Sequence, residues 1–318
     1  MHCELAMPGL LSAQPAMRAP ALELLMARGR HSTQEPLSLE KWLCERFGAE
    51  TLAAGAYTLL GAGGEPGDEA WARADPVHLR LLRDRMVVMP AEMLSLPIDE
   101  ARALAAGLRD ILEVEVVSPR RWCVRLPSGA CAGERTALEA AGKPAPIERS
   151  SDALLTEIQM ALHAHPVNAA REARGEPVVN SVWLWGGGRL ETLERSALHS
   201  VLADDPLALG LARAAATRHA KLPQGAHAWL ERAPEDGRHL IVLDELRAPA
   251  ALPADEDMRN VLERLERDWF APLLAALRAG RIGMVTLHVP DGAAASFETI
   301  RGDLRRFWRR PKPLGAFT

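Results

Sequence analysis

Residues able to hold an anion are concentrated between positions 163 and 188. In this stretch a helix is expected to end at Pro166, a polar turn then presents Asn168 and Arg171, and a strand carries Trp185 into three glycines. Ligands of open α/β sheets lie outside the carboxyl ends of strands, and backbone N–H groups of a glycine-rich turn can approach an anion closely. The spacing therefore allows an anion site, although the same residues could serve only to close turns.

A second set of residues has the chemistry of metal ligands: Asp244, Glu245, His288 and Asp291. No pair among them has a ligand spacing such as HxH on a strand or HExxH on a helix. His288 also lies within an apolar stretch, where a core role is the simpler interpretation. We therefore expect no metal site. The alternative is a metal-dependent phosphotransferase or phosphatase that holds Mn, Zn or Mg, with Thr286 as a candidate nucleophile.

Basic and aromatic side chains alternate near the end of the chain. They are Arg301, Arg305, Arg306, Phe307, Trp308, Arg309 and Arg310. Stacking and charge could together grip an acidic protein partner or a single-stranded nucleic acid, which would make the chain an interaction module. The simpler interpretation is a solvated helix end whose Phe307 and Trp308 dock on the sheet, so nucleic acid is not an expected partner.

The composition excludes several classes of protein. The 318 residues carry 38 basic and 42 acidic side chains, a net charge of −4, so no overall field attracts nucleic acid or an anionic membrane. Of the basic residues 34 are arginine, which makes bidentate anion binders plentiful. The four cysteines form no CxxC pair, and the chain shows neither 18 consecutive apolar residues nor a convincing signal peptide. These features predict a cytoplasmic protein with no membrane partner.

The elements that must position these residues alternate between helices and strands, which predicts an α/β fold. The first 20 residues look like a loose arm, and residues 127–150 like a surface loop. Helices are expected over 21–30, 38–48, 98–112, 151–165 and 258–280, with Ser38 as an N-cap and Gly48 as a stop. Strands are expected within 72–89, as a hairpin over 114–127, and over 181–188, 238–246 and 283–292.

The stretch that ends in the three glycines resembles the HPVNxxR…GxxPAN…GxG block of archaeal-type, cofactor-independent phosphoglycerate mutases, members of the alkaline phosphatase superfamily. The matching residues are His165, Pro166, Val167, Asn168, Arg171, Gly175, Pro177, Asn180, Gly186 and Gly188. Weaker echoes lie around Arg73 and Asp75, which resemble that family's GD…RCNFATV strand, and around Arg121, which resembles its HR-containing strand. All three fall in the family's substrate-binding subdomain, whose arginines hold a phosphate. The resemblance therefore implies an anion site made of Arg73, Asp75, Arg121, Asn168, Arg171, Asn180, Trp185, Gly186, Gly187 and Gly188.

The departures from that family bear on catalysis. The family needs two metal ions and a serine nucleophile, but its Gly-Ser-Asp signature is missing, and the nearest look-alike, Pro66–Asp68, has no serine. The family's Asp-rich and His-rich strand end corresponds to Asp244–Pro249, its Asp-His-Ser-Thr-Pro turn to Val289–Gly292, and the arginine before its glycine turn to Trp185. Loss of the metals removes nearly all the rate of phosphoryl transfer. We therefore expect no mutase activity.

Three runs extend the pattern over nearly the whole chain from about Ala21: WxRADPVHLRxxRDR at 71–85, HPVNxxREARGEPxVNSxWLWGGGRL at 165–190 and RGDLRRFWRR at 301–310. With these runs the chain also resembles a proteobacterial family of regulatory proteins of the RpfE type. The resemblances together predict a trimmed alkaline-phosphatase-like α/β core, residues 1–64 and 190–318, with an inserted α+β substrate-binding-type subdomain at 65–189. They imply a soluble regulatory or metabolite-binding protein, without a cofactor, that keeps a phosphate or carboxylate pocket. A small anionic metabolite and a protein are its expected partners.

Overall fold

The computed structural model describes residues 1–12, 17–81, 86–127, 132–141, 143, 152–232, 236–252 and 254–317. Cys131 and half of the expected 127–150 loop lie outside these ranges. The chain divides into two compact units, Met1–Gly48 with Leu193–Thr318, and Ala49–Thr192. The first boundary therefore lies before helix α3 (Ala54–Gly61), whereas the predicted α/β core segment, residues 1–64, includes this helix. The helix packs instead on strands of the second unit, because Gly55 brings it directly against the backbone of Ala72.

The first unit is built on a seven-stranded sheet with the order β2-β12-β11-β1-β10-β8-β9. Its strands are β1 (His2–Ala6), β2 (Arg30–Thr33), β8 (Ser200–Leu202), β9 (Arg218–Ala220), β10 (Arg238–Val242), β11 (Met284–Val289) and β12 (Ala295–Ile300). Strands β11, β1, β10, β8 and β9 are parallel, while β12 and β2 add an antiparallel edge.

The loose arm expected over the first 20 residues is wrong for its first part, because His2–Ala6 is a strand at the middle of this sheet. Its residues alternate between polar His2 and Glu4 and apolar Cys3 and Leu5, the period of a strand with two different faces. Because Glu4 interrupts a short apolar run, this alternation was not recognised as a strand.

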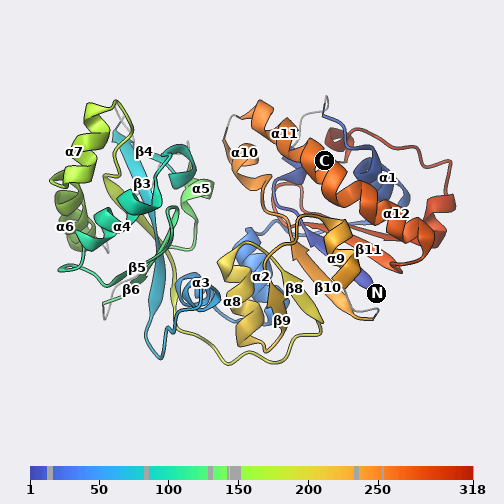
Figure 1. Cartoon of the computed structure of the whole chain (residues 1–318), viewed down its shortest axis with the longest axis horizontal. Helices are drawn as coiled ribbons and strands as arrows, with labels where there is room; N and C mark the ends of the chain where they lie inside the picture. The colour runs from blue at the N-terminus through green and yellow to red at the C-terminus, as the bar shows by residue number, and fades with distance from the viewer. Residues whose placement is uncertain are drawn as a thin grey trace. The chain divides into compact units, whose positions relative to one another are not determined.

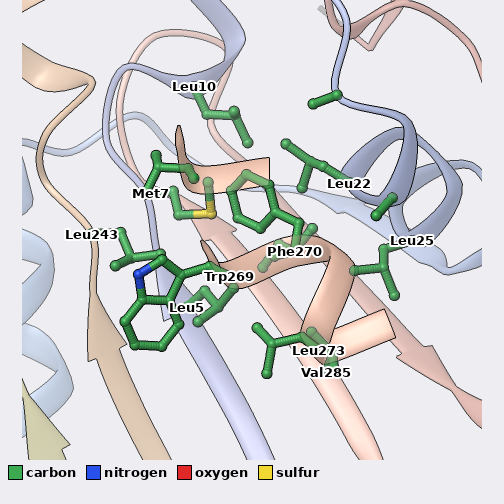
Figure 2. Close-up of a cluster of buried hydrophobic side chains, with 14 of the residues drawn as sticks. Leu5, Met7, Leu10, Leu22, Leu25, Leu243, Trp269, Phe270, Leu273 and Val285 are labelled. Atoms are coloured by element: carbon green, nitrogen blue, oxygen red, sulfur yellow. The ribbon is translucent and has the colours of Figure 1, made fainter. Parts of the chain in front are cut away.

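Apolar side chains fill one face of the sheet. In its described ranges this unit has the helices α1 (Pro20–Arg28), α2 (Leu39–Phe47), α8 (Pro206–Ala214), α9 (Ala226–Arg232), α10 (Arg247–Ala251), α11 (Asp255–Leu265) and α12 (Ala271–Ala279). The last two are joined by a π-helical turn, Glu266–Phe270. Side chains from α1, α9, α11 and α12 form one core with β1, β10 and β11. Figure 2 shows part of it, where Phe270 lies beside Met7 and Leu10. Burying such rings and chains supplies the main driving force for folding.

Helix α2 covers polar positions on the opposite face. As predicted, Ser38 caps it, with its hydroxyl accepting a hydrogen bond from the Lys41 amide, and Gly48 ends it in a left-handed conformation. The Trp42 ring lies 5.2 Å from the ring of His288 on β11. These contacts set the helix over the middle of the sheet.

The second unit contains antiparallel strands around the long strand β3 (Figure 1). The path is β4-β3-β6-β5, with β7 paired to β3. The strands are β3 (Trp71–Leu81), β4 (Met86–Met89), β5 (Val114–Ser118), β6 (Arg121–Arg125) and β7 (Ser181–Gly188). The predicted hairpin is confirmed as β5 and β6, and the predicted strand over 181–188 as β7.

Helices α4 (Ile98–Ala106) and α6 (Asp152–His163) bury their apolar sides on this sheet, around Trp122 and Val182. The unit also holds α3, α5 (Ala137–Ala140) and α7 (Pro166–Ala173). The polar turn predicted after Pro166 is wrong: Pro166 begins α7, and the ring of His165 caps it by accepting from the Val167 amide. No helix of the described ranges is long and apolar enough to cross a bilayer.

Candidate functional site

Carboxylates gather at the carboxyl ends of the parallel strands of the first unit, where open α/β sheets bind ligands. Arg247, the first residue of α10, donates two hydrogen bonds to Glu40 of α2, at 2.6 and 2.9 Å. Asp205 and Asp244 add their charges around the same guanidinium. Burial alone would lower the pKa of Arg247, but Glu40 and the two aspartates raise it above its usual value. A permanent cation thus sits among the carboxylates of this edge.

Asp291, which follows β11 at the same edge, is held by the backbone. Both its carboxylate oxygens accept from the Gly9 amide, at 2.9 and 3.0 Å. Burial raises the pKa of Asp291, and the hydrogen bond from Gly9 offsets this only in part. Gly9 has a φ of +82°, and a Cβ there would lie 2.7 Å from the carbonyl oxygen of Leu246, so glycine is required for this close approach.

Three of the four residues considered as metal ligands are engaged by other groups of the protein. Glu245 is paired with Arg264, and His288 lies 3.4 Å from Glu4. Asp291 is bound to the Gly9 amide. Within the described ranges no group of three or more His, Cys, Asp or Glu side chains is arranged to hold an ion. The carboxyl edge is therefore organised around a guanidinium and a backbone amide.

In the second unit, Arg73, Asp75 and Trp185 form a closed cluster on neighbouring strands β3 and β7. Arg73 donates to Asp75 at 2.5 Å, the Trp185 indole donates to the other oxygen of Asp75 at 2.7 Å, and the Arg73 guanidinium lies 5.0 Å from the Trp185 ring. Burial raises the pKa of Asp75 more than these partners lower it. Because all three residues are buried, the positive charge of Arg73 is directed at Asp75 rather than at solvent.

Arg121 is separated from that cluster along the sheet. It is the first residue of β6, paired with Ser118 at the hairpin end, and it is half-buried. Arg73 pairs with Cys123, two residues further along the same strand. The two arginines therefore belong to one face of the sheet, but they occupy different positions along it.

The two asparagines of the predicted anion site bind backbone groups. Asn168 donates to the carbonyls of Leu162 and Val179, at 2.8 and 2.7 Å, and accepts from the Val179 amide at 3.0 Å. Asn180 donates to the Leu79 carbonyl at 2.9 Å and accepts from the Leu79 amide at 2.7 Å. Both side chains hold the residues that lead into the start of β7, which is the turn-closing role that the sequence also allowed.

Arg171 is fully buried and bonded on all three nitrogens. It donates to the carbonyl oxygens of Pro177 and Leu94, at 2.9 and 2.5 Å, and to Glu100 at 2.6 Å. An anion could reach this guanidinium only by displacing these partners. Arg171 therefore belongs to a different cluster from Arg73.

The three glycines of β7 allow α3 to pack closely on the strand. Cβ atoms on Gly186 and Gly188 would lie 2.5 and 2.8 Å from the Cβ atoms of Ala54 and Ala53. Gly187 lies between them, at a bulge of the strand where Gly186 has a φ of +59°. The glycine turn expected to receive an anion is therefore wrong: these glycines belong to a strand, and their lack of a side chain lets a helix pack against it.

A buried carboxylate on the central strand of the first unit was not among the predicted site residues. Glu4 is 1% exposed and contacts Arg46, Arg238 (2.8 Å), His288 (3.4 Å) and His2 (3.7 Å). Burial alone would raise the pKa of Glu4, but His288, Arg46 and Arg238 lower it to about 2. Glu4 is therefore ionised, and its contacts join β1 to β10, β11 and α2.

A basic cavity of about 360 Å³ opens at the amino ends of β8, β9 and β10, the sheet edge opposite the carboxylates. We call it the amino-edge cavity. Its lining consists of Arg195, Ser196, Ala197, Leu198, His199, Ala216, Thr217, Arg218, Gly237 and Arg238. Among the described residues this lining holds three arginines and no carboxylate. The cavity therefore has the size and charge to take a small anion.

The arginines of the amino-edge cavity differ in how they are paired. Arg238 forms an ion pair with Glu4, and 43% of the Arg238 side chain is exposed. Arg218 lies 3.3 Å from the His199 ring, and no carboxylate of the described residues pairs with Arg218 or Arg195. Two guanidinium groups thus face solvent without a counter-charge, beside a third that is fixed in position.

A larger depression of about 730 Å³, between α4 and β5 of the second unit, is electrically balanced. Its lining includes three arginines and three carboxylates, Arg102, Arg109, Arg125, Asp110, Glu113 and Glu115. Arg125 and Glu113 form an ion pair at 2.8 Å. With its charges satisfied internally, this depression favours an anion less than the smaller amino-edge cavity does.

The predicted site does not include the residues of the amino-edge cavity, because ligands of open α/β sheets are expected at the carboxyl ends of the strands. A signal was present: Arg238 opens the strand RHLIV, and Arg218 opens the strand RHA. Parallel strands bring their first residues to one edge of a sheet, so the arginines that begin β9 and β10, the strands on either side of β8, lie at the same edge.

Comparison with known proteins supports the fold. Neither a protein-family model nor a curated protein matches the sequence. The structure of the PH0037 protein from Pyrococcus horikoshii is similar, with a TM-score of 0.58 and 14% identity over 94% of this chain and 87% of that one. A cofactor-independent phosphoglycerate mutase from Thermoplasma acidophilum matches with a TM-score of 0.46 and 17% identity, over 95% and 90% of the two chains. The chain shares the fold of the Pyrococcus protein, and the predicted α/β fold class is confirmed.

Proposed function

We propose that this protein binds a small phosphorylated or carboxylated metabolite in the amino-edge cavity and does not transfer phosphoryl groups. The observation that carries the proposal is the set of three arginines around a cavity whose described lining holds no carboxylate. Guanidinium groups bind phosphate and carboxylate through paired, charge-assisted hydrogen bonds. The ligand class is the one expected from the sequence, but the site lies in the other unit.

The proposal that phosphoryl transfer is absent rests on the carboxyl edge of the sheet. Metal-assisted phosphoryl transfer needs carboxylates free to bind cations. Here Glu40 binds Arg247 with both oxygens, and Asp291 binds the Gly9 amide with both oxygens. Together with the resemblance of residues 165–188 to the mutase block, this supports a non-catalytic relative of the cofactor-independent phosphoglycerate mutases. A cytoplasmic regulatory role, as implied by the RpfE-type resemblance, would then act through the bound metabolite.

The ligand-binding half of the proposal is tested by thermal unfolding in the presence of 3-phosphoglycerate, inorganic phosphate or citrate, against chloride at equal ionic strength. A ligand that binds only the folded state stabilises it by about 2.7 kcal/mol at one hundred times its Kd, so the melting temperature of the wild type should rise. The double variant Arg195→Gln/Arg218→Gln should lose most of this rise. A matched variant, Arg232→Gln/Arg278→Gln, removes two exposed arginines elsewhere and should keep it.

Two results would contradict the proposal separately. If no phosphorylated or carboxylated compound raises the melting temperature of the wild type, the protein is not a metabolite binder of this class. If the purified protein converts 3-phosphoglycerate to 2-phosphoglycerate with added Mn²⁺, Mg²⁺ or Zn²⁺, and a chelator abolishes the activity, the protein is a phosphotransferase after all.

A further inference from the structure

The C-terminal segment presents two aromatic rings to solvent. Phe307 is 76% exposed and Trp308 is 66% exposed, and their rings meet edge to face at 5.3 Å. The sequence favoured docking of both rings on the sheet, and the structure contradicts this expectation. The chain turns through a short 3-10 helix, Arg301–Arg305, and then carries both side chains outward. Two adjacent exposed rings of this size need an explanation beyond folding.

The backbone beneath these rings is fixed to the first unit. Arg306 pairs with Asp303 at 2.9 Å and donates to the carbonyl oxygen of Arg28 at 3.2 Å. Arg309 donates to the carbonyl oxygen of Gly29 at 2.8 Å. One arginine on each side of the ring pair thus anchors the segment to the end of α1, so the rings form a positioned platform rather than a loose tail.

The charge around the platform is strongly positive. Residues 301–312 include six basic side chains and one acidic side chain, Asp303, which Arg306 already engages. No carboxylate of the described residues pairs with Arg305, Arg310 or Lys312, and all three are exposed. The net charge of −4 for the whole chain conceals this local excess.

We propose that Phe307, Trp308 and the flanking cations bind single-stranded nucleic acid, with bases stacked on the rings and phosphates held by Arg305, Arg310 and Lys312. Every base offers a flat π-face, and a single strand carries one phosphate per nucleotide, so interleaved rings and cations match its repeat. An acidic protein segment would complement the positive charge, but it offers few flat groups that could stack on two rings. This surface is separate from the amino-edge cavity, and the inference does not depend on the proposed function.

Fluorescence anisotropy with labelled dT12 and rU12 tests the proposal on the full chain. We expect both oligonucleotides to bind, with an affinity that falls steeply as salt rises, by roughly 0.7 log units per tenfold salt increase for each phosphate contacted. Phe307→Ala/Trp308→Ala should weaken binding at constant salt by about 5-fold to 100-fold for each stacked base that is lost. Arg305→Gln/Arg310→Gln should mainly flatten the salt dependence.

Met160→Ala, which removes an exposed apolar side chain from α6, is the matched control and should bind as the wild type does. Since the two rings are exposed, the ring variant should unfold at the same temperature as the wild type, which separates lost binding from lost folding. A preference between dT12 and rU12 identifies the kind of strand. The proposal is wrong if neither oligonucleotide binds at low salt, or if the ring variant binds as well as the wild type. It is also wrong if a labelled polyglutamate peptide binds and its binding depends on the rings more strongly than oligonucleotide binding does.

Discussion

The two edges formed by the parallel strands of the first unit differ in charge and in whether their charged side chains are paired. At the carboxyl ends, Glu40 and Asp291 are bound to Arg247 and to the Gly9 amide. At the amino ends, Arg195 and Arg218 line a cavity without a paired carboxylate in the described residues. The charges of the carboxyl edge are thus neutralised within the protein, whereas the arginines of the amino edge are available to an anion.

This contrast separates a fold from the chemistry usually found on it. Ligands of open α/β sheets normally lie at the carboxyl ends of the strands, and the sequence interpretation followed that rule. Function depends on particular side chains rather than on topology, so an edge whose charges are already satisfied offers little to a ligand. The unsatisfied charges are the better guide to a binding site here.

Replacing Arg247 should produce the largest effect on stability. The change Arg247→Met leaves the Glu40 carboxylate buried without its cation, so we expect a loss of about 3–5 kcal/mol in the free energy of unfolding, measured by urea denaturation. Adding Glu40→Gln to this variant should recover part of the loss, because the buried charge is then removed.

The matched control for Arg247 is Arg264→Met, which breaks the exposed Arg264–Glu245 pair. That change should cost no more than about 1 kcal/mol, as surface ion pairs do. Equal losses in the two variants would mean that the carboxyl edge is not held together by Arg247, and the contrast between the edges would fail.

His239 makes the amino edge sensitive to pH. Burial above all, and then the nearby positive charges of His199, the N-terminus and His2, lower the pKa of His239 to about 4. Its neutral ring hydrogen-bonds Ser200 at 2.8 Å. The unfolded chain takes up a proton near pH 6.5 and the folded chain only near pH 4, so stability contributed by the neutral ring is complete above pH 6.5 and is lost as pH falls toward 4.

The pKa difference of His239 corresponds to a loss on the order of 3 kcal/mol across that window. Urea denaturation at several pH values should show this slope in the wild type and a weaker slope in His239→Asn, which cannot titrate. The His227→Asn variant, which changes a histidine on α9, serves as the control and should keep the wild-type slope. Parallel curves for His239→Asn and the wild type would exclude His239 as the group responsible.

Gly9→Ala tests how closely the carboxyl edge is packed. An alanine Cβ would lie 2.7 Å from the Leu246 carbonyl oxygen and force a φ of +82°, so we expect a loss of about 1–3 kcal/mol. Gly48→Ala is the matched control, since Gly48 has a φ of +73° with open space around it and should show only the smaller conformational cost. Similar losses by urea denaturation would show that close packing at Gly9 is unimportant.

Local sequence signals predicted elements better than they predicted the site. Ser38 and Gly48 bound α2 as expected, since caps act through neighbouring backbone groups. The strand at His2–Ala6 was missed because its partners, β10 and β11, lie more than 230 residues away in the chain. The contacts of the predicted anion-site residues could not be foreseen for a related reason: whether Arg171 is free or bonded to Glu100 and Leu94 depends on tertiary contacts that its spacing does not reveal.

The smallest effect is expected from Arg195→Gln/Arg218→Gln in the absence of ligand. Both side chains are exposed and neither has a carboxylate partner in the described residues, so the free energy of unfolding should change by no more than about 0.5 kcal/mol. Because the wild-type arginines repel one another, added salt should stabilise the wild type slightly more than the variant. Urea denaturation at low and high salt measures both quantities, with Arg232→Gln/Arg278→Gln as the reference. A loss above about 1 kcal/mol would mean that the fold relies on these arginines as the carboxyl edge relies on Arg247, and the two edges would then be alike.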